Sequence, residues 1–574
     1  MSPIRIPNAF FALAAVVGAG LLAVSPMDLR AQNARAAGPD RAPADLVALN
    51  GRIYTADGAR PVVQAIAVRD GRIVFAGDER GARALVGPET ETLDLAGRTM
   101  IPGMTDAHAH VAGLGESLRN VDLTGTTSYD QVIARVVERA RTTPAGEWIL
   151  GRGWDQNDWG DTRFPTHEAL SRAVPNHPVY LTRVDGHAAL VNAAGMQKAG
   201  ITRSTQDPSG GSIERDAQGN PAGVFVDNAQ GLVGRAIPAA TRAQVKESIK
   251  AAIAEMHRWG MTGVHDAGAS PTVLELYEEL GRENALNIRL YAMISDRAQT
   301  VNAWLERGPL IAAHDGMLWV RSIKLYQDGA LGSRGAALLE PYSDNPETNG
   351  LLVSAPAHIL DVATRALRAG FQVNTHAIGD RGNRLVLDSY EAALDSIPTA
   401  DHRFRVEHAQ ILHADDIPRF AELGVIPSMQ ASHQTSDMYW AGTRLGETRL
   451  RGAYAWRSLL NTGVVIPNGS DFPVERVNPL ISFLASVARQ DAQGWPAGGW
   501  YPEQRMTRDE ALKSMSLWPA YAAFQENELG SLAEGKRADF VVLSQDIMRV
   551  PTEVILDTEV ISTWVGGRKV YERK

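Results

Sequence analysis

The stretch that decides the fold is Ile101-Pro-Gly-Met-Thr-Asp-Ala-His-Ala-His110, in which a short apolar run ends in a His-x-His pair. Side chains along a β-strand alternate between its two faces, so residues two apart point the same way. His108 and His110 can therefore offer both imidazoles to one cation. The pair alone is a weak signal, because His-x-His also occurs by chance among hydrogen-bonded core or surface histidines.

Four further residues suited to a metal site follow short apolar runs later in the chain. They are Lys324, His376, His408 and Asp471. In a barrel of parallel strands, side chains at successive strand ends meet on one rim, where active sites are built. Imidazole and carboxylate groups are ordinary ligands of catalytic zinc. These positions and the His-x-His pair together predict a metal centre, and assigning them all structural roles would need several coincidences.

Apolar runs alternate with helix-like segments between about residues 99 and 500, which is the pattern of a parallel α/β sheet. His265 and His433 mark two more candidate strand ends, which gives seven ends and leaves one strand unplaced. The pattern predicts a (β/α)8 TIM barrel. Residues from about 115 to 225 break this rhythm, since they are dense in Trp, Gly, Asp and Pro. We expect them to form an inserted subdomain over the barrel mouth.

Both ends of the chain are rich in β-forming residues. Residues 44–98 contain apolar runs closed by Asn50-Gly51 and Asp70-Gly71, and such dipeptides are hairpin signals. Residues 525–574 have the same texture. We therefore predict one small β-sandwich assembled from both termini.

The composition is that of a globular protein: 574 residues, of which 44% are hydrophobic and 21% charged. The net charge of −9 and the lack of a basic tract argue against nucleic acid as a partner. Because the chain has no cysteine, a metal must be bound by His, Asp, Glu or a modified Lys. This donor set suits one or two zinc ions, with iron, manganese or cobalt as substitutes. We expect a small-molecule substrate, and a homodimer is compatible with the sequence.

The first 36 residues read as a signal peptide and leader. Arg5 supplies a positive charge, the apolar run 10–24 follows, and small residues near Ala31 and Ala36 offer cleavage sites. The run is shorter than the roughly 20 residues that a membrane span needs. We predict a periplasmic or secreted protein with no stable membrane span after cleavage; an uncleaved anchor is the alternative.

The chain resembles the amidohydrolase superfamily, and in particular the branch that includes N-substituted formamide deformylases. Beside the stretch quoted first, the resemblance rests on motifs that occur in family order and cover nearly everything after about residue 44. These are Lys324-Leu-Tyr-Gln-Asp-Gly-Ala-Leu-Gly-Ser-Arg334, His376-Ala-Ile-Gly-Asp380, Val406-Glu-His-Ala-Gln410, Gly469-Ser-Asp-Phe-Pro473 and Gly535-Lys-Arg-Ala-Asp-Phe540. The family fold implied is a (β/α)8 barrel with a β-sandwich from both termini.

The resemblance also implies roles for the metal-seeking residues. His108, His110 and Asp471 would bind the more buried ion, and His376 and His408 the more exposed one. Lys324 would bridge the ions as an N-carboxylated carbamate, because a free ammonium has only donors and cannot be a ligand. In the alternative, Lys324 is an ordinary rim lysine or binds a substrate carboxylate, and the site is mononuclear.

The activity implied is hydrolysis of a non-peptide C–N bond in an amide, N-formyl group, carbamate or cyclic amide. The nucleophile would be a metal-bound hydroxide that attacks directly, with Asp471 taking its proton and passing it to the leaving amine. The same centre could instead serve an ester, lactone or phosphoester hydrolase. A non-catalytic periplasmic binding protein is a remote alternative, since it should have lost a ligand.

Several other residues are candidates for contact with the substrate. His187 is a second catalytic candidate, and Arg183 would polarise or hold the substrate; a buried turn with an Asp–His hydrogen bond is the alternative. Trp154, Asp328 and Arg334 are further candidate substrate contacts, against roles in packing or in supporting the ligands. His433 could face the substrate, and His265 would support a ligand. Glu407 is expected to form a salt bridge in the barrel rather than to act as the base.

Overall fold

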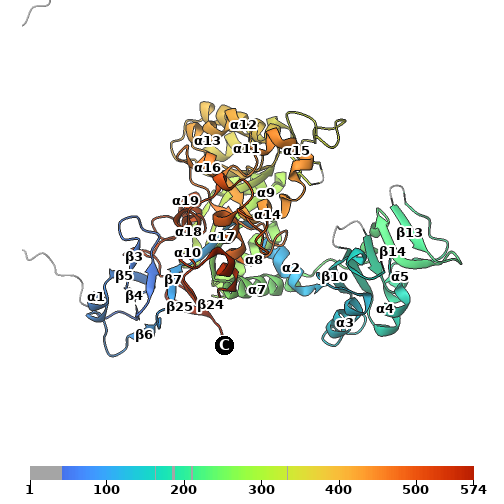
Figure 1. Ribbon diagram of the computed structural model, residues 1–574, viewed down its shortest axis with the longest axis horizontal. Coiled ribbons are helices and arrows are strands. Elements are labelled where there is room, and N and C mark those ends of the chain that lie inside the picture. Colours follow the sequence, from blue (N-terminus) through green and yellow to red (C-terminus); the bar gives the residue numbers. More distant parts are fainter. Residues whose placement is uncertain (1–41, 162, 184–187, 209–210, 333) are drawn as a thin grey trace, which may run out of the picture. The chain divides into compact units, whose positions relative to one another are not determined.

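The computed structural model describes residues 42–574, except for 162, 184–187, 209–210 and 333. The predicted signal peptide and leader and His187 lie outside these residues. Pro43–Lys574 forms one unit, whose elements are shown in Figure 1. Within the described part of the chain, no helix is both long and apolar enough to cross a membrane.

Eight parallel strands form the predicted barrel, and each is hydrogen-bonded to the next along the chain. Seven hydrogen-bonded ladders join the eight strands in chain order. The last strand, β22, meets the first, β8, at a seam with two backbone hydrogen bonds: Asp471 N donates to His108 O at 2.7 Å and His110 N donates to Phe472 O at 2.9 Å. The strands are β8 (Met104–Ala109), β15 (Met261–Ala269), β16 (Arg289–Ser295), β18 (Leu318–Tyr326), β19 (Gln372–Ala377), β20 (Arg405–His408), β21 (Ile426–Gln430) and β22 (Asn468–Gly469). The prediction of a (β/α)8 barrel is therefore confirmed.

Two of the expected strand ends are placed differently. His265 lies in the middle of β15, and His433 lies three residues beyond β21, in the first turn of a helix. The strand that the sequence left unplaced is β16. Its residues are almost all buried, as expected for a strand with both faces covered in a parallel sheet.

Helices follow the barrel strands because amphipathic segments, some of them with a side-chain cap at the N-terminus, occupy the connections. In α7, the Thr241 side chain accepts from Gln244 N, while Ile249, Ile253 and Met256 repeat at helical spacing and are buried. The larger helices are α2 (Val111–Arg119), α7 (Arg242–Arg258), α8 (Pro271–Arg282), α9 (Ala298–Arg307), α11 (Pro356–Ala369), α12 (Asp380–Ser396), α13 (Ile417–Leu423), α14 (Ala431–Asp437), α15 (Ala441–Leu450), α16 (Trp456–Leu460), α17 (Pro479–Ala488), α18 (Arg508–Ser514) and α19 (Leu517–Ala522).

Strands from both termini form the two sheets of the sandwich. One sheet has the order β5-β4-β1-β6 and the other β25-β24-β23-β7-β2-β3. At the predicted hairpin between β4 and β5, Asp70 and Gly71 have φ values of 51° and 71°, as a tight turn of this kind requires. The strands are β1 (Leu46–Leu49), β2 (Arg52–Tyr54), β3 (Val62–Val63), β4 (Ala65–Arg69), β5 (Arg72–Gly77), β6 (Glu91–Asp94), β7 (Thr99–Pro102), β23 (Phe540–Leu543), β24 (Val560–Val565) and β25 (Arg568–Glu572).

The sandwich reaches a few residues further into the chain than expected, because β7 pairs with β2 and β23 rather than with a barrel strand. A buried ion pair fixes the barrel to the C-terminal part of the sandwich: Arg289 on β16 donates to Asp539 at 2.8 and 3.0 Å. Removing one partner of a buried pair leaves an uncompensated charge, so this contact holds the two parts together.

The interruption of the barrel rhythm is a separate six-stranded sheet of order β13-β14-β12-β11-β10-β9. It has apolar cores of its own, one around Trp154 and Leu181 and another around Phe225. Its position over the barrel mouth stays a prediction. Its main elements are β9 (Val121–Asp122), α3 (Tyr129–Ala140), β10 (Ile149–Trp154), α4 (His167–Ala173), β11 (Val179–Arg183), β12 (Ala188–Val191), α5 (Ala193–Lys198), β13 (Gly211–Arg215) and β14 (Pro221–Asp227).

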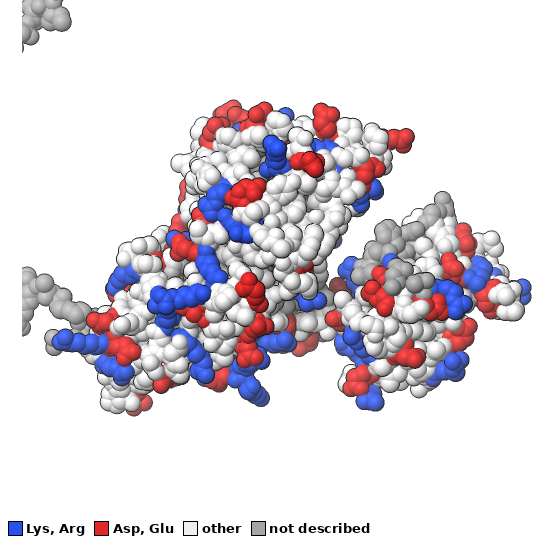
Figure 2. Space-filling view, in the orientation of Figure 1, with Lys and Arg blue, Asp and Glu red and all other residues white. Residues whose placement is uncertain are grey.

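Charged side chains of both signs are interleaved on the face drawn in Figure 2, and neither colour dominates it. Among the described residues, many charged side chains pair locally; Lys246, for example, contacts Glu279 and Glu283, each at 2.7 Å. Exposed pairs of this kind contribute little to stability, and they leave no large field of one sign on this face.

Candidate metal centre

The carboxyl ends of the barrel strands bring the predicted ligands together. The Asp471 Oδ1 atom lies 3.0 Å from His110 Nε2 and 3.6 Å from His108 Nε2. The ring centroids of His376 and His408 are 4.4 Å apart, and those of His108 and His408 are 4.8 Å apart. Two donor atoms bound to one tetrahedral zinc ion, each at about 2.1 Å, lie about 3.4 Å from each other. The spacing around Asp471 therefore suits a shared ion.

Unusual backbone geometry positions two of these residues. His408 has a φ of 75° and Asp471 a φ of 62°, in the left-handed region that residues with a side chain rarely adopt. Such conformations persist where surrounding contacts enforce them, and they are frequent at functional sites. Gly469 permits the close approach of β22 to β8, because a Cβ atom there would lie 2.5 Å from His108 N. A larger residue would push Asp471 away from the histidines.

The buried histidines are electrically neutral and oriented for metal binding. Burial, reinforced by the charge of Lys324, lowers the pKa of His108 to about 4 and the pKa of His376 to about 3. The Nδ1 atom of His108 lies 2.5 Å from Glu407 Oε2, and the Nδ1 atom of His408 lies 2.6 Å from Gln430 Oε1. An Nδ1–H that donates to an acceptor leaves the Nε2 lone pair free for a cation.

Several nitrogen and oxygen atoms that could bind a metal at this centre have no hydrogen-bond partner in the described part of the chain. Among the described residues, the buried atoms without a hydrogen-bond partner include His376 Nε2, His433 Nε2 and Asp471 Oδ1. Burial opposes ionisation of Asp471, but the neighbouring imidazoles of His110 and His108 hold the pKa of this carboxyl well below its usual range. Neutral imidazoles and an ionised carboxylate are ligands of divalent metal ions. Because these nitrogen and oxygen atoms form no hydrogen bonds within the described chain, they are suited to bind such an ion.

Lys324 lies in the same cluster, fully buried on β18. Its Nζ atom is 3.1 Å from His108 Nε2 and 5.0 Å from the ring centroid of Tyr326. Burial lowers the pKa of Lys324 to about 8, so roughly a tenth of the side chain is a neutral amine at pH 7, far more than for an ordinary lysine. A neutral amine is the form that can react with carbon dioxide to give a carbamate.

A network beneath the histidines was only partly foreseen. Glu407 forms the expected salt bridge, to Arg405 at 2.8 Å, but it also contacts His108. Arg405 in turn donates to Ala107 O at 2.6 Å. Asp106 accepts from His108 N and from the backbone and side chain of Ser470, and burial raises its pKa to about 7. The two-residue period of a strand places Asp106 on the same face as His108. The contacts with residues of other strands could not be predicted, because no local sequence pattern marks them.

Asp328 and Arg334 order the loop that follows β18. Asp328 is buried and accepts from the backbone N–H groups of Ala337, Ile378 and Gly379 at 2.8–2.9 Å. One of its oxygens lies 3.7 Å from His376 Nε2. Arg334 pairs with Asp344 at 2.8 Å. A direct contact of either residue with a substrate stays a prediction.

The candidates in the insertion have partners within the insertion itself. Trp154 is fully buried and its Nε1–H donates to Leu181 O at 2.8 Å. Arg183 donates to Asp155 at 2.5 Å and to Gln156 at 2.9 Å. Their roles in substrate binding, like that of His187 outside the described residues, stay predictions. In the barrel, the Nδ1 atom of His265 lies 3.0 Å from Arg405.

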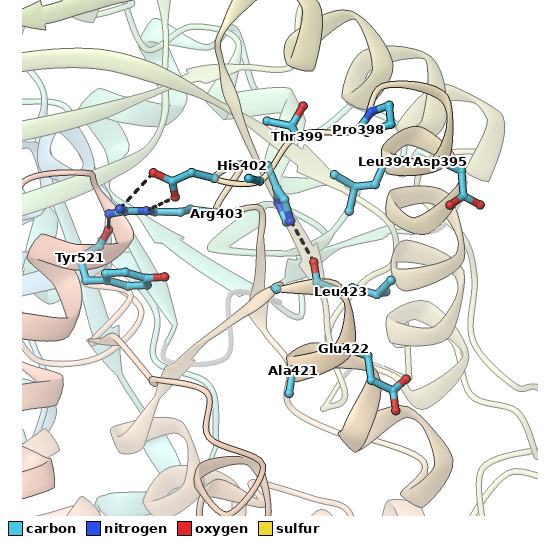
Figure 3. Close-up of a pocket in the computed structure, with 13 residues that line it drawn as sticks. Leu394, Asp395, Pro398, Thr399, His402, Arg403, Ala421, Glu422, Leu423 and Tyr521 are labelled. Atoms are coloured by element: carbon cyan, nitrogen blue, oxygen red, sulfur yellow. Dashed lines mark hydrogen bonds and ion pairs between the residues drawn. The ribbon is translucent and has the colours of Figure 1, made fainter. Parts of the chain in front are cut away.

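An open cavity lies at the other end of the barrel (Figure 3). It measures about 600 Å³ and is lined by residues before β20 and at the ends of α12 and α13. Arg403 donates to Asp401 and to Glu526 there, whereas the exposed carboxylates of Asp395 and Glu422 also line the cavity. The described residues that line the cavity include no convergent set of buried imidazoles and carboxylates, so the cluster around Asp471 marks the site instead.

A (β/α)8 barrel with imidazoles and a carboxylate meeting at its carboxyl rim defines a hydrolase barrel with a metal centre. The model of the Amidohydrolase family matches residues 91–571, and the chain belongs to this family. It is thus a hydrolase of the class that acts on carbon–nitrogen bonds.

Relatives of known name align over almost the whole chain. The protein LONG AFTER FAR-RED 3 of Arabidopsis thaliana is 32% identical, with 92% of each chain covered. The N-substituted formamide deformylase of Arthrobacter pascens is 29% identical, with 92% of this chain and 98% of the relative covered. A crystal structure of an uncharacterized metal-dependent hydrolase from Pyrococcus furiosus superposes with a TM-score of 0.72 at 30% identity, covering 88% of this chain and all of that one.

Proposed function

We propose that the protein is a metal-dependent hydrolase that cleaves a non-peptide C–N bond in an amide, N-formyl group, carbamate or cyclic amide. The observation that carries the proposal is the placement of Asp471. Its Oδ1 atom lies near His108 and His110 and its Oδ2 atom near His433, and Oδ1 has no hydrogen-bond partner among the described residues. An ionised carboxylate so placed can both bind a metal and accept a proton.

His108, His110, His376, His408 and Asp471 would hold the metal, and Lys324 would join them once carboxylated. A divalent ion bound there lowers the pKa of a coordinated water and polarises a carbonyl. Asp471, at the rim and ionised at neutral pH, would take the proton of the attacking water and return it to the leaving amine. Glu407 and Gln430 keep two of the imidazoles in the orientation that binding needs.

Zinc is our proposed metal, because the donors are imidazoles and carboxylates without thiolate. Carboxylation of Lys324 is supported by its burial, its position 3.1 Å from His108 and its lowered pKa. N-substituted formamides are the first substrates to examine, since a relative that aligns over 92% of this chain carries that activity in its name.

The test combines a metal count with a substrate panel. Metal-free protein is loaded with zinc, manganese, cobalt or iron, the bound metal is measured by elemental analysis, and each form is assayed on N-formyl amines, N-acyl amines, carbamates, cyclic amides, esters and lactones. We expect turnover of a C–N substrate that depends on the metal and disappears in His108→Ala. Turnover of esters or lactones alone, or C–N hydrolysis unaffected by removal of metal, would overturn the proposal.

We also propose that the protein is exported to the periplasm or secreted. Support comes from Arg5, the apolar run 10–24 and the small residues that follow. N-terminal sequencing of protein recovered from periplasm and medium tests this, with a new terminus between about residues 31 and 37 as the expected result. Recovery of the intact chain in the cytoplasm would contradict it.

A further inference from the structure

His433 lies beside the predicted ligands although it is not one of them. It is in the first turn of α14, and its side chain is only 12% exposed. Its Nε2 atom is 3.7 Å from Asp471 Oδ2. Its ring is stacked on that of His408, with the centroids 5.7 Å apart and the planes 15° from parallel. His433 and His110 therefore lie nearest to different oxygens of the Asp471 carboxylate.

The two oxygens of Asp471 face different histidines. Oδ1 lies near His108 and His110, whereas Oδ2 lies near His433. Two sets of donor atoms, each within 4.8 Å of one another, result: His108, His110 and Asp471 form one, and His408, His433 and Asp471 form the other. The carboxylate is the only residue common to both sets among those described.

The buried Nε2 atom of His433 has no hydrogen-bond partner in the described part of the chain. Leaving a buried polar nitrogen without a partner is unfavourable, so each such atom in a native fold needs an explanation such as a bound group. The 3.7 Å separation from Asp471 Oδ2 is close to the roughly 3.4 Å expected for two donors on one tetrahedral ion. A cation between them would satisfy both atoms.

Helix α14 is fixed at both ends, so the position of His433 is well determined. At its start, Ala431 N donates to the side chain of Asn468 on β22 at 3.1 Å. At its end, Asp437, one turn after His433, accepts from Tyr454 OH at 2.5 Å and from Gln410 Nε2 at 2.9 Å. The helix thus holds the imidazole against Asp471 and His408 rather than leaving it free to turn outward.

We propose that His433 is a direct ligand of a second metal ion, together with His408, and that Asp471 bridges the two ions with one oxygen on each. The proposal rests on the metal dependence proposed above, and it adds the helix after β21 to a centre otherwise built at strand ends. Asp471 then links the ions itself, alongside any bridge from Lys324.

The test measures metal directly, without substrate. Wild type, His433→Ala and the control His413→Ala are loaded with excess zinc, and bound metal is counted by elemental analysis and titrated against a chromophoric chelator. His413 is a suitable control because it is 43% exposed and contacts only its neighbour Asp415 among the ion pairs of the described chain. Losing a residue that merely supports a ligand lowers metal affinity by about 10–100-fold, and losing a direct ligand should lower it further. We therefore expect His433→Ala to lower the affinity for one of the two ions by at least about 100-fold and to leave the affinity for the other unchanged.

Two additions make the result decisive. His433→Glu supplies another donor and should restore part of the second ion, and it provides a folded comparison if the alanine variant is unstable. Cobalt-substituted protein should show altered visible absorption in His433→Ala but not in His413→Ala. A wild type that binds one ion at saturation, or a His433→Ala that binds two with unchanged affinity, overturns the proposal. A wild type that binds two ions but hydrolyses no C–N substrate would refute the proposed function alone.

Discussion

The two ends of the barrel contain similar side chains but use them differently. At the carboxyl end, His376, His433 and Asp471 have buried donor atoms without hydrogen-bond partners. At the amino end, beside the cavity of Figure 3, His402 donates through Nε2 to Leu423 O at 2.9 Å and accepts from Phe404 N at 2.9 Å. Burial lowers the pKa of His402, as it does at the metal centre. Burial and a shifted pKa therefore do not distinguish the ends; what distinguishes the carboxyl end is that several of its imidazole and carboxylate atoms have no hydrogen-bond partner within the described chain.

The largest expected effect concerns Lys324. Lys324→Ala should lose essentially all activity, because no carbamate could form between the two ligand sets. A short carboxylic acid added without bicarbonate should restore part of the activity by supplying the missing oxygens. The assay is turnover with and without the acid, together with intact-mass analysis of the wild type. An unmodified amine in an active, fully metallated enzyme would reject the bridge and favour a single ion.

Asp471→Asn tests the proton transfer. An amide keeps the shape of the side chain but cannot take a proton from the attacking water at working pH. The kcat should fall by more than the roughly 10²–10⁴-fold typical of losing a general base, while the fold and at least part of the metal remain. Kinetics on the metal-loaded variant provide the measurement. If kcat stays within a few-fold of wild type, the base must be sought elsewhere, with His187 the first candidate.

Gln430→Leu and Gln372→Leu compare the two ends directly. Gln430 accepts from His408 Nδ1, so its loss should lower metal affinity by about 10–100-fold. Gln372 is a buried glutamine at the start of β19, bonded to Ala522 O and Tyr291 OH, far along the strand from the ligands. Its loss should lower the melting temperature without changing metal affinity. Chelator titration and thermal unfolding of both variants check this, and equal effects on metal would remove the distinction between the ends.

The smallest effect is a pH dependence at His402. Its folded pKa lies below the usual value near 6.5, so the stability that its neutral ring provides is present above pH 6.5 and is lost as the pH falls through the folded value. Protonation would end the hydrogen bond from Phe404 N. His402→Gln should be less stable than wild type by about 1 kcal/mol at pH 8, with a smaller difference at pH 5. Thermal unfolding at both pH values measures it; activity at pH 8 should be unchanged.

Much of the barrel and the positions of the predicted ligands could be inferred from sequence, because both rest on local patterns. Apolar runs ending in His108, Lys324, His376, His408 and Asp471 locate strand ends one at a time, and parallel topology then gathers them. Strand β16 could not be located from the sequence in this way, because it ends at Ser295, which is not a typical metal ligand. His433 was assigned to a strand end, whereas the chain has already turned into α14 there.

Contacts between distant strands could not be inferred. The approach of Glu407 to His108, of Gln430 to His408 and of Asp106 to Ser470 depends on the relative register of strands that are up to 364 residues apart. Each of these residues has a polar side chain at an ordinary strand position, and only the folded register shows that it orients a ligand. The assignment of Glu407 to a salt bridge was therefore correct but incomplete.

The seam between β8 and β22 has a consequence for the movements of the barrel. Its two hydrogen bonds join the backbones of His108 and His110 to those of Asp471 and Phe472. The strand contact that closes the barrel is therefore formed by the same residues as the metal centre. An ion held from both sides would bind only the closed form, and by mass action it would stabilise that form by about 4 kcal/mol at a thousand times its dissociation constant. Amide hydrogens of His110 and Asp471 should then exchange with solvent slowly in loaded protein and faster after chelation, reporting how often the barrel opens.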